Sequence, residues 1–176
     1  MNTSTNVTYE KNVKLSTRQL CLTAILIAFT FVVTRFLQIP IPLGYFNIGN
    51  SVILISCLFV SSPYGILVGS IGSALADLTS YPEYALPTLI IKAIMPVIFY
   101  AIIKIHKDSA KMCILAFAVA TLIPLFGYTL VGGILSGSIT AGFIQFPGLL
   151  LEYVANIIIF CSVLNPCLKY RKIVNF

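Results

Sequence analysis

Long apolar segments, separated by loops of very uneven charge, dominate this chain. Of its 176 residues, 59% are hydrophobic and only 9% are charged, and the mean hydropathy is +1.00. A soluble domain carries about 25% charged residues, so this composition excludes a water-facing surface. The apolar runs are about 18–24 residues long and do not alternate strictly, which favours membrane-spanning helices over a β-barrel. We therefore predict an all-α membrane protein that forms one domain.

The basic residues indicate how the chain is oriented in the membrane. Spans are predicted at 17–37, 48–62, 63–79, 87–105, 112–135 and 148–168. Six transmembrane helices put all three basic clusters on one side, whereas the loops at 38–47, 80–86 and 136–147, which lack Lys and Arg, lie on the other. Because basic loops stay inside, both the N- and C-termini are predicted to be cytoplasmic. The net charge of +6 thus reflects orientation and gives no reason to expect nucleic-acid binding.

The predicted organisation has three parts. Residues 1–16 form a polar cytoplasmic N-terminus, residues 17–168 form the six-helix membrane domain, and residues 169–176 form a basic cytoplasmic tail. Small residues recur at a spacing that lets helices approach closely in lipid. Ala24 and Ala28 form one such pair, and Gly65, Gly69 and Gly72 form a second close-packing face.

Three ionisable side chains fall within the spans: Asp77, Lys92 and Glu152. Leaving a charge at membrane depth costs at least about 2.5–3.5 kcal/mol, so such groups are functional candidates. Asp77 is near the outer end of its span. Lys92 and Glu152 lie about five residues below the start of theirs, or roughly 7 Å deep. All three are therefore predicted in one shallow layer near the outer face, with Asn156 one helical turn below Glu152.

Other polar and aromatic residues are predicted at similar depth: Asn47, Asn50, Glu83, Tyr84, Tyr128, Gln145 and Tyr153. Two interpretations follow. The charged groups could form a structural ion pair, Lys92 with Glu152 or with Asp77. Alternatively, they could hold a polar ligand that enters from outside, since aromatic rings with a few placed donors and acceptors suit a small heterocycle.

The chain carries no catalytic signature. It has no HExxH, GxSxG or P-loop motif and no metal-ligand spacing. Its single histidine, His106, lies in a basic cytoplasmic loop away from the acids. We therefore expect neither an enzyme nor a metal site, and no ATP site of its own.

Three segments carry a family resemblance: FNIGN at 46–50, SPYGILVGSIGSALADL at 62–78 and YALPTLIIKAIM at 84–95. Through them the chain resembles the substrate-binding (S) subunits of energy-coupling factor vitamin transporters over nearly its whole length. Within these it is most similar to the group assigned to hydroxymethylpyrimidine or pyridoxine. Asn50 departs from the acidic residue expected at its position in that group, so a hydrogen bond would replace a charge contact.

The resemblance implies a function and partners. An S subunit binds a vitamin or precursor from outside, associates with a transmembrane coupling subunit and two cytoplasmic ATPases, and is thought to topple in the membrane to release its ligand. ATP is used by the partners, and no cofactor is expected in this chain. The alanine motif that contacts the coupling subunit corresponds to Ala24 and Ala28. The expected ligand is thus a pyridine- or pyrimidine-like vitamin.

Two other functions stay open at this point. A self-sufficient small carrier or channel would transport without ATPases and would need a polar path to the cytoplasm, but the inner segments 97–103 and 157–164 are apolar. A membrane enzyme or assembly scaffold would be favoured by an activity that depends on His106.

Overall fold

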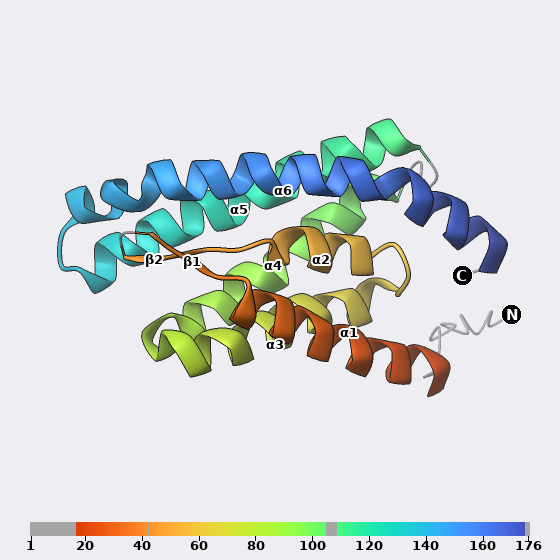
Figure 1. The fold of residues 1–176 in the computed structure, drawn as a ribbon, viewed down its shortest axis with the longest axis horizontal. Helices are drawn as coiled ribbons and strands as arrows, with labels where there is room; N and C mark the ends of the chain where they lie inside the picture. Colours follow the sequence, from red (N-terminus) through yellow and green to blue (C-terminus); the bar gives the residue numbers. More distant parts are fainter. Residues whose placement is uncertain (1–16, 42, 105–108, 175–176) are drawn as a thin grey trace, which may run out of the picture.

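The computed structural model describes residues 17–41, 43–104 and 109–174. His106 and the first 16 residues lie outside the described residues. Over the described part, six α-helices and one short β-hairpin form an elongated bundle (Figure 1). The helices are α1 (Thr17–Phe36), α2 (Gly49–Ser56), α3 (Ser62–Ser80), α4 (Ala85–Ile103), α5 (Ala110–Leu135) and α6 (Ile139–Val174). Strands β1 (Ile39–Ile41) and β2 (Gly44–Phe46) pair antiparallel, and a single 3₁₀ turn, η1 (Pro82–Tyr84), precedes α4.

Four helices of this set are long and apolar enough to cross a membrane: α1, α4 with its preceding turn, α5 and α6. Their outer surfaces carry large exposed apolar side chains such as Ile25 and Ile134, which suit a lipid environment. The mostly helical membrane fold is thus confirmed. The ends predicted for the first, third, fourth and fifth spans lie within two residues of the observed helix ends.

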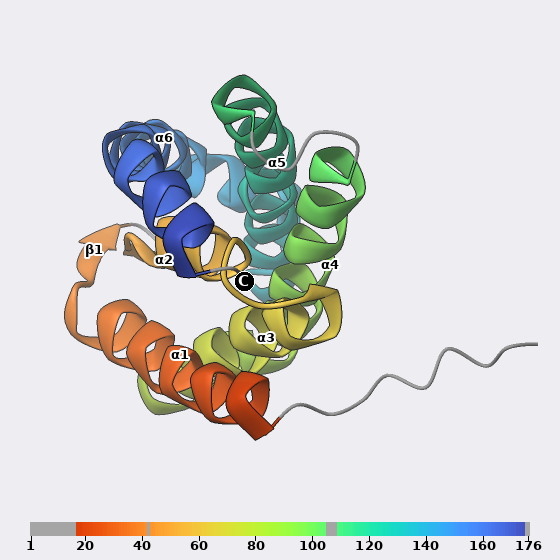
Figure 2. The ribbon, with the colours of Figure 1, turned by 90° about the vertical axis from the view of Figure 1, so that its right-hand side faces the viewer.

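The second predicted span is helical over a much shorter segment than expected. It was expected at 48–62, but α2 has only 8 residues, which is about 12 Å of helix. Residues 57–60 continue as turns instead. The helix can be this short because it is enclosed by protein, where irregular backbone finds hydrogen-bond partners that lipid does not offer. Ile53 and Leu54 are fully buried, and α2 lies among the other helices near the middle of the bundle (Figure 2).

The loop predicted at 38–47 also forms regular structure. It contains the β1–β2 hairpin, so the expectation of an all-α chain needs this correction. Prolines alone do not prevent a strand pair here, because β1 and β2 are both edge strands and Pro40 does not have to donate to a further strand.

The connection between α5 and α6 is shorter than predicted. Residues 136–147 were expected to be a loop, but α6 begins at Ile139. Gly137 adopts a positive φ of 67°, and the Ser138 and Gly137 amides donate to the carbonyls of Gly133 and Ile134. This is the Schellman arrangement that ends a helix, and it turns the chain within three residues. Pro147 then lies inside α6 rather than before it.

Helices α1 and α3 run in parallel. Near their starts, Ser61 Oγ donates to the side-chain oxygen of Gln19 at 3.0 Å, and near their ends Gln38 Nε2 donates to Ser80 Oγ at 3.3 Å. The segment between these helices therefore runs back along the whole bundle, through the hairpin and α2. The start of α1 and the end of α6 lie at one end of the molecule, opposite the hairpin (Figure 1).

An aromatic cluster fills the half of the bundle away from the hairpin. The rings of Phe117 and Phe160 stack with centroids 4.2 Å apart, and Phe99 meets Phe160 edge-on at 6.3 Å. All three side chains are essentially inaccessible and belong to one continuous apolar core with α2. Such packing leaves no room for water between these three rings.

Candidate functional site

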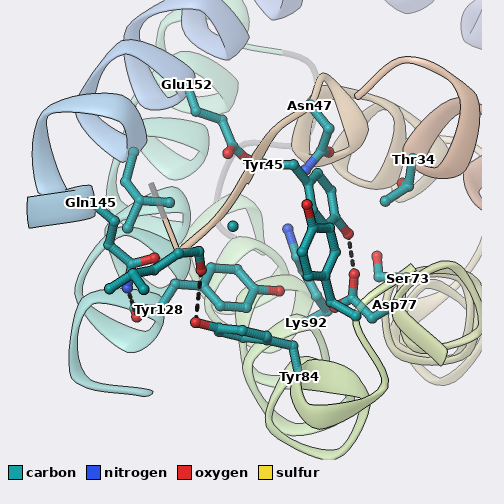
Figure 3. Close-up of a pocket in the computed structure, with 14 residues that line it drawn as sticks. Thr34, Tyr45, Asn47, Ser73, Asp77, Tyr84, Lys92, Tyr128, Gln145 and Glu152 are labelled. Atoms are coloured by element: carbon teal, nitrogen blue, oxygen red, sulfur yellow. Dashed lines mark hydrogen bonds between the residues drawn. The ribbon is translucent and has the colours of Figure 1, made fainter. Parts of the chain in front are cut away.

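A pocket lies at the hairpin end of the bundle (Figure 3). Its walls come from β2 and from the ends of five helices, α1 and α3 through α6. The lining residues are Thr34, Leu43, Gly44, Tyr45, Asn47, Ser73, Asp77, Tyr81, Tyr84, Lys92, Tyr128, Gln145, Leu149 and Glu152.

Asp77 is the buried acceptor on the α3 wall. The hydroxyl of Tyr45 donates to one of its carboxylate oxygens, and the hydroxyl of Thr88 donates to the other. The Thr88 hydroxyl has one proton, which it donates to Asp77. The Tyr128 hydroxyl, 3.0 Å away, therefore acts as the donor to the Thr88 oxygen. Burial, and next the nearby Asp77 carboxylate, raise the pKa of Tyr45, so this phenol remains a donor.

Lys92 and Glu152 come from facing helices, α4 and α6. The Lys92 ammonium donates to the side-chain oxygen of Asn50, and the Asn50 amide donates to Glu152 at 3.1 Å. Lys92 Nζ also lies 5.4 Å from the centre of the Tyr128 ring, within cation–π range. Among the residues that the structure describes, Lys92 forms no direct ion pair with Glu152 or Asp77. Lys92 and Glu152 are therefore connected through Asn50 instead of forming the direct ion pair considered from the sequence. Both side chains line the pocket.

Asn156 fixes the start of α2 against α6. Its amide donates to the Asn47 carbonyl at 2.9 Å, and its oxygen accepts from the Ser51 backbone amide at 2.9 Å and from the Ser51 hydroxyl at 2.8 Å. With 0% exposure, Asn156 lies behind the pocket and has no capacity left for a ligand. The Asn47 side chain accepts from the Gly49 amide at 2.7 Å, which shapes the turn into α2.

Tyrosine rings make up most of the remaining wall. Tyr45 and Tyr81 stack with centroids 5.4 Å apart, and Tyr84 and Tyr128 lie tilted at 6.4 Å. The Tyr84 hydroxyl donates to the Leu43 carbonyl at 2.8 Å and so ties the hairpin turn to the start of α4. Flat rings with polar tips suit a planar ligand that carries hydrogen-bonding edges.

The structure brings most of the predicted site residues together. Those that line the pocket are Asn47, Asp77, Tyr84, Lys92, Tyr128, Gln145 and Glu152. Asn50 and Tyr153 line a small neighbouring cavity that shares Tyr128, Leu149 and Glu152 with the pocket. Exposed Glu83 lines a third hollow at the mouth. Contact of any of these residues with a ligand stays a prediction.

Several lining residues were not predicted. Tyr45 and Tyr81 lie in the charge-free outer segments, and the aromatic criterion applied to Tyr84 could have included them. Thr34 and Ser73 carried no such signal, because single hydroxyl residues in apolar helices are common. Ala24 and Ala28 lie on the exposed face of α1, away from this pocket.

The family model for "ECF-type riboflavin transporter, S component" matches residues 14–168. The chain belongs to this family. It is a substrate-binding component of a vitamin transporter, a multi-pass membrane protein and not an enzyme. The resemblance drawn from the sequence was right at the level of energy-coupling factor S components. Its assignment to the hydroxymethylpyrimidine or pyridoxine group was wrong, because the matching model is that of the riboflavin group.

Two individual proteins are similar to this S component. A Pyrococcus woesei protein described as "Uncharacterized protein in gap 3'region" is 33% identical over 108 residues, which cover 60% of this chain and 72% of that protein. A solved structure, "Structure and mechanism of the S component of a bacterial ECF transporter", matches with a TM-score of 0.65 at 22% identity. It covers 90% of this chain and 96% of its own, and so supports the S-component fold.

Proposed function

We propose that this S component binds riboflavin in the tyrosine-lined pocket and presents it for import. The family match over 14–168 is the observation that carries this proposal. The pocket supports it independently, because tyrosines and buried polar groups converge there from five helices and the hairpin. The earlier expectation of a single small ring is replaced by a larger flavin.

The chemistry of the walls fits the isoalloxazine ring. This ring system is flat and largely apolar, and one edge carries carbonyl oxygens, ring nitrogens and an N–H. Tyr84 and Tyr128 offer faces for stacking, and Leu149 adds apolar contact. Lys92 can donate to a ring carbonyl and Glu152 can accept from the ring N–H. Gln145, whose amide donates to the Tyr128 carbonyl, retains an oxygen that can accept.

The proposed topology has six crossings, with both termini cytoplasmic and the pocket open to the outside. The return path between α1 and α3 supports the second crossing, even though α2 is short. The loops predicted at 38–47, 80–86 and 136–147 contain no Lys or Arg, whereas most basic residues of the sequence lie toward the opposite end. The three-part division at 16/17 and 168/169 stays a proposal, and α6 itself continues as helix to Val174.

The proposed partners are a transmembrane coupling subunit and two cytoplasmic ATPases, which would use the ATP, while this chain would need no cofactor. Ala24 and Ala28 lie four residues apart on the exposed face of α1. Their small side chains would let a partner helix approach closely. The contact with the coupling subunit is proposed there.

A direct test is equilibrium binding of riboflavin to the purified protein, followed by quenching of flavin fluorescence. We expect saturable binding of one flavin per chain. Pyridoxine and hydroxymethylpyrimidine, added in excess, should not displace it. Mass spectrometry of molecules that copurify with the protein should then show riboflavin. The proposal fails if riboflavin neither binds nor raises the melting temperature, or if one of the two smaller compounds displaces it.

A further inference from the structure

Two buried hydroxyls on one wall of the pocket have no hydrogen-bond partner. Thr34 on α1 is 2% exposed and Ser73 on α3 is 1% exposed. Within the described ranges, neither Thr34 Oγ1 nor Ser73 Oγ meets a donor or acceptor, yet both residues line the pocket. A buried polar atom without a partner costs about 1–3 kcal/mol, so each such atom requires an explanation.

Several other helix hydroxyls among the described residues form a local hydrogen bond. The hydroxyls of Ser70, Thr121 and Thr129 each donate to the backbone carbonyl four residues earlier, at 2.7–2.8 Å. This bond is open to any Ser or Thr within a helix. Thr34 and Ser73 are also within helices but do not make it. Their hydroxyls therefore remain free to bind whatever occupies the pocket.

The two ends of the pocket differ in chemistry. At the α1–α3 end, Thr34 and Ser73 lie on the same side as Asp77 (Figure 3). Thr34 also lies against the start of α2, where a Cβ on Gly49 would be 2.5 Å from its hydroxyl oxygen. At the α5–α6 end lie Tyr128 and Gln145 (Figure 3), and Leu149 of α6 also lines the pocket.

We propose that Thr34 and Ser73 bind the polyol chain of the ligand, with the ring system directed toward Tyr128 and Leu149. This inference rests on the proposed riboflavin function and adds the orientation of the ligand to it. Each hydroxyl of a polyol both donates and accepts, and a Ser or Thr hydroxyl can reciprocate either role by rotating. Asp77 adds an acceptor beside them. The tyrosine wall at the other end suits the face of a flat ring.

The test compares riboflavin with lumiflavin, which has the same ring but a methyl group in place of the polyol chain. Thr34→Val and Ser73→Ala should each weaken riboflavin binding about 3–10-fold, the value of one hydrogen bond. Lumiflavin binding should not change. Thr30→Val is the matched control, because Thr30 is equally buried and unpartnered on α1 but does not line the pocket. It should alter neither affinity.

A second measurement separates binding from folding. Without ligand, Thr34→Val should not lower the melting temperature, because it removes an unsatisfied buried hydroxyl while keeping the side-chain volume. Thr34→Ser keeps the hydroxyl and should keep riboflavin binding. The inference is overturned if the Val and Ala variants weaken both flavins equally or neither. If the unaltered protein binds neither flavin, the proposed function itself has failed.

Discussion

Lys92 and Glu152 meet through one shared side chain, that of Asn50, which accepts from the ammonium and donates to the carboxylate at 3.1 Å. This bridge joins α4, α2 and α6 at the floor of the site. It also keeps two opposite charges buried within reach of each other, where the loss of one would leave the other uncompensated.

We predict that Lys92 and Glu152 are energetically coupled. Lys92→Met or Glu152→Gln alone should lower the free energy of unfolding by about 3–5 kcal/mol, because each leaves an unbalanced buried group. The double variant should lose less than the sum of the two. Thermal unfolding in detergent provides the measurement, and Lys104→Met, at an exposed lysine after the same helix, serves as control. Strictly additive losses would contradict the coupling.

Tyr45→Phe should loosen the hairpin over the pocket. The substitution removes one of the two hydroxyl donors to Asp77, a charge-assisted bond that contributes about 1.5–3 kcal/mol. We expect a lower melting temperature and weaker riboflavin binding, both measured on the purified protein. Tyr81→Phe is the matched control, because it retains the ring that stacks on Tyr45 and leaves both bonds to Asp77 intact. Equal effects of the two variants would argue against a specific role for the Tyr45 hydroxyl.

Riboflavin 5′-phosphate should bind at least about 10-fold more weakly than riboflavin. In the proposed orientation the phosphate would lie close to the Asp77 carboxylate, and like charges a few ångströms apart repel by about 1–4 kcal/mol in a partly hydrated site. Competition binding measures the ratio of the two affinities. Asp77→Asn should reduce that ratio, whereas Glu83→Gln should change it little, because Glu83 is exposed and its charge is screened. A ratio near unity in the unaltered protein would refute this prediction.

Ala24→Leu combined with Ala28→Leu should block assembly without affecting the pocket. Two larger side chains on the exposed face of α1 would keep a partner helix at a distance. Copurification with the coupling subunit and uptake in cells should be lost, while riboflavin binding to the isolated chain remains. Ala101→Leu, the same change at an exposed alanine of α4, should leave assembly intact. Normal copurification of the double variant would place the contact elsewhere.

The ends of α1, α3, α4 and α5 could be predicted from the sequence, because hydropathy marks where each span begins and ends. The layer of polar side chains could also be predicted, because the few charged residues within the spans lie at similar depth. Asp77, Lys92 and Glu152 were expected at one depth, and they do meet in one pocket. Their depth follows from counting residues along each span, which needs no knowledge of how the helices are arranged.

The boundaries of α2 and α6 depend on how the helices pack, so hydropathy and residue counting could not predict them. The early end of α2 and the helical course of 139–147 arise where neighbouring helices enclose the backbone, so the prolines and apolar runs used to set the boundaries were misleading. The ligand group was also missed. Motifs shared by S components locate the site, whereas the choice of ligand depends on walls that the fold assembles from five helices and the hairpin.

The packed rings of Phe99, Phe117 and Phe160 have a consequence for transport. They close the pocket on the side away from the hairpin. A polar molecule bound in the pocket can therefore leave only toward the side from which it entered, because the packed rings block the other direction. Alone in a bilayer, such a chain can load and unload its vitamin reversibly but cannot accumulate it. Work from a nucleotide-consuming partner would have to reorient or part the helices before the cargo could reach the cytosol.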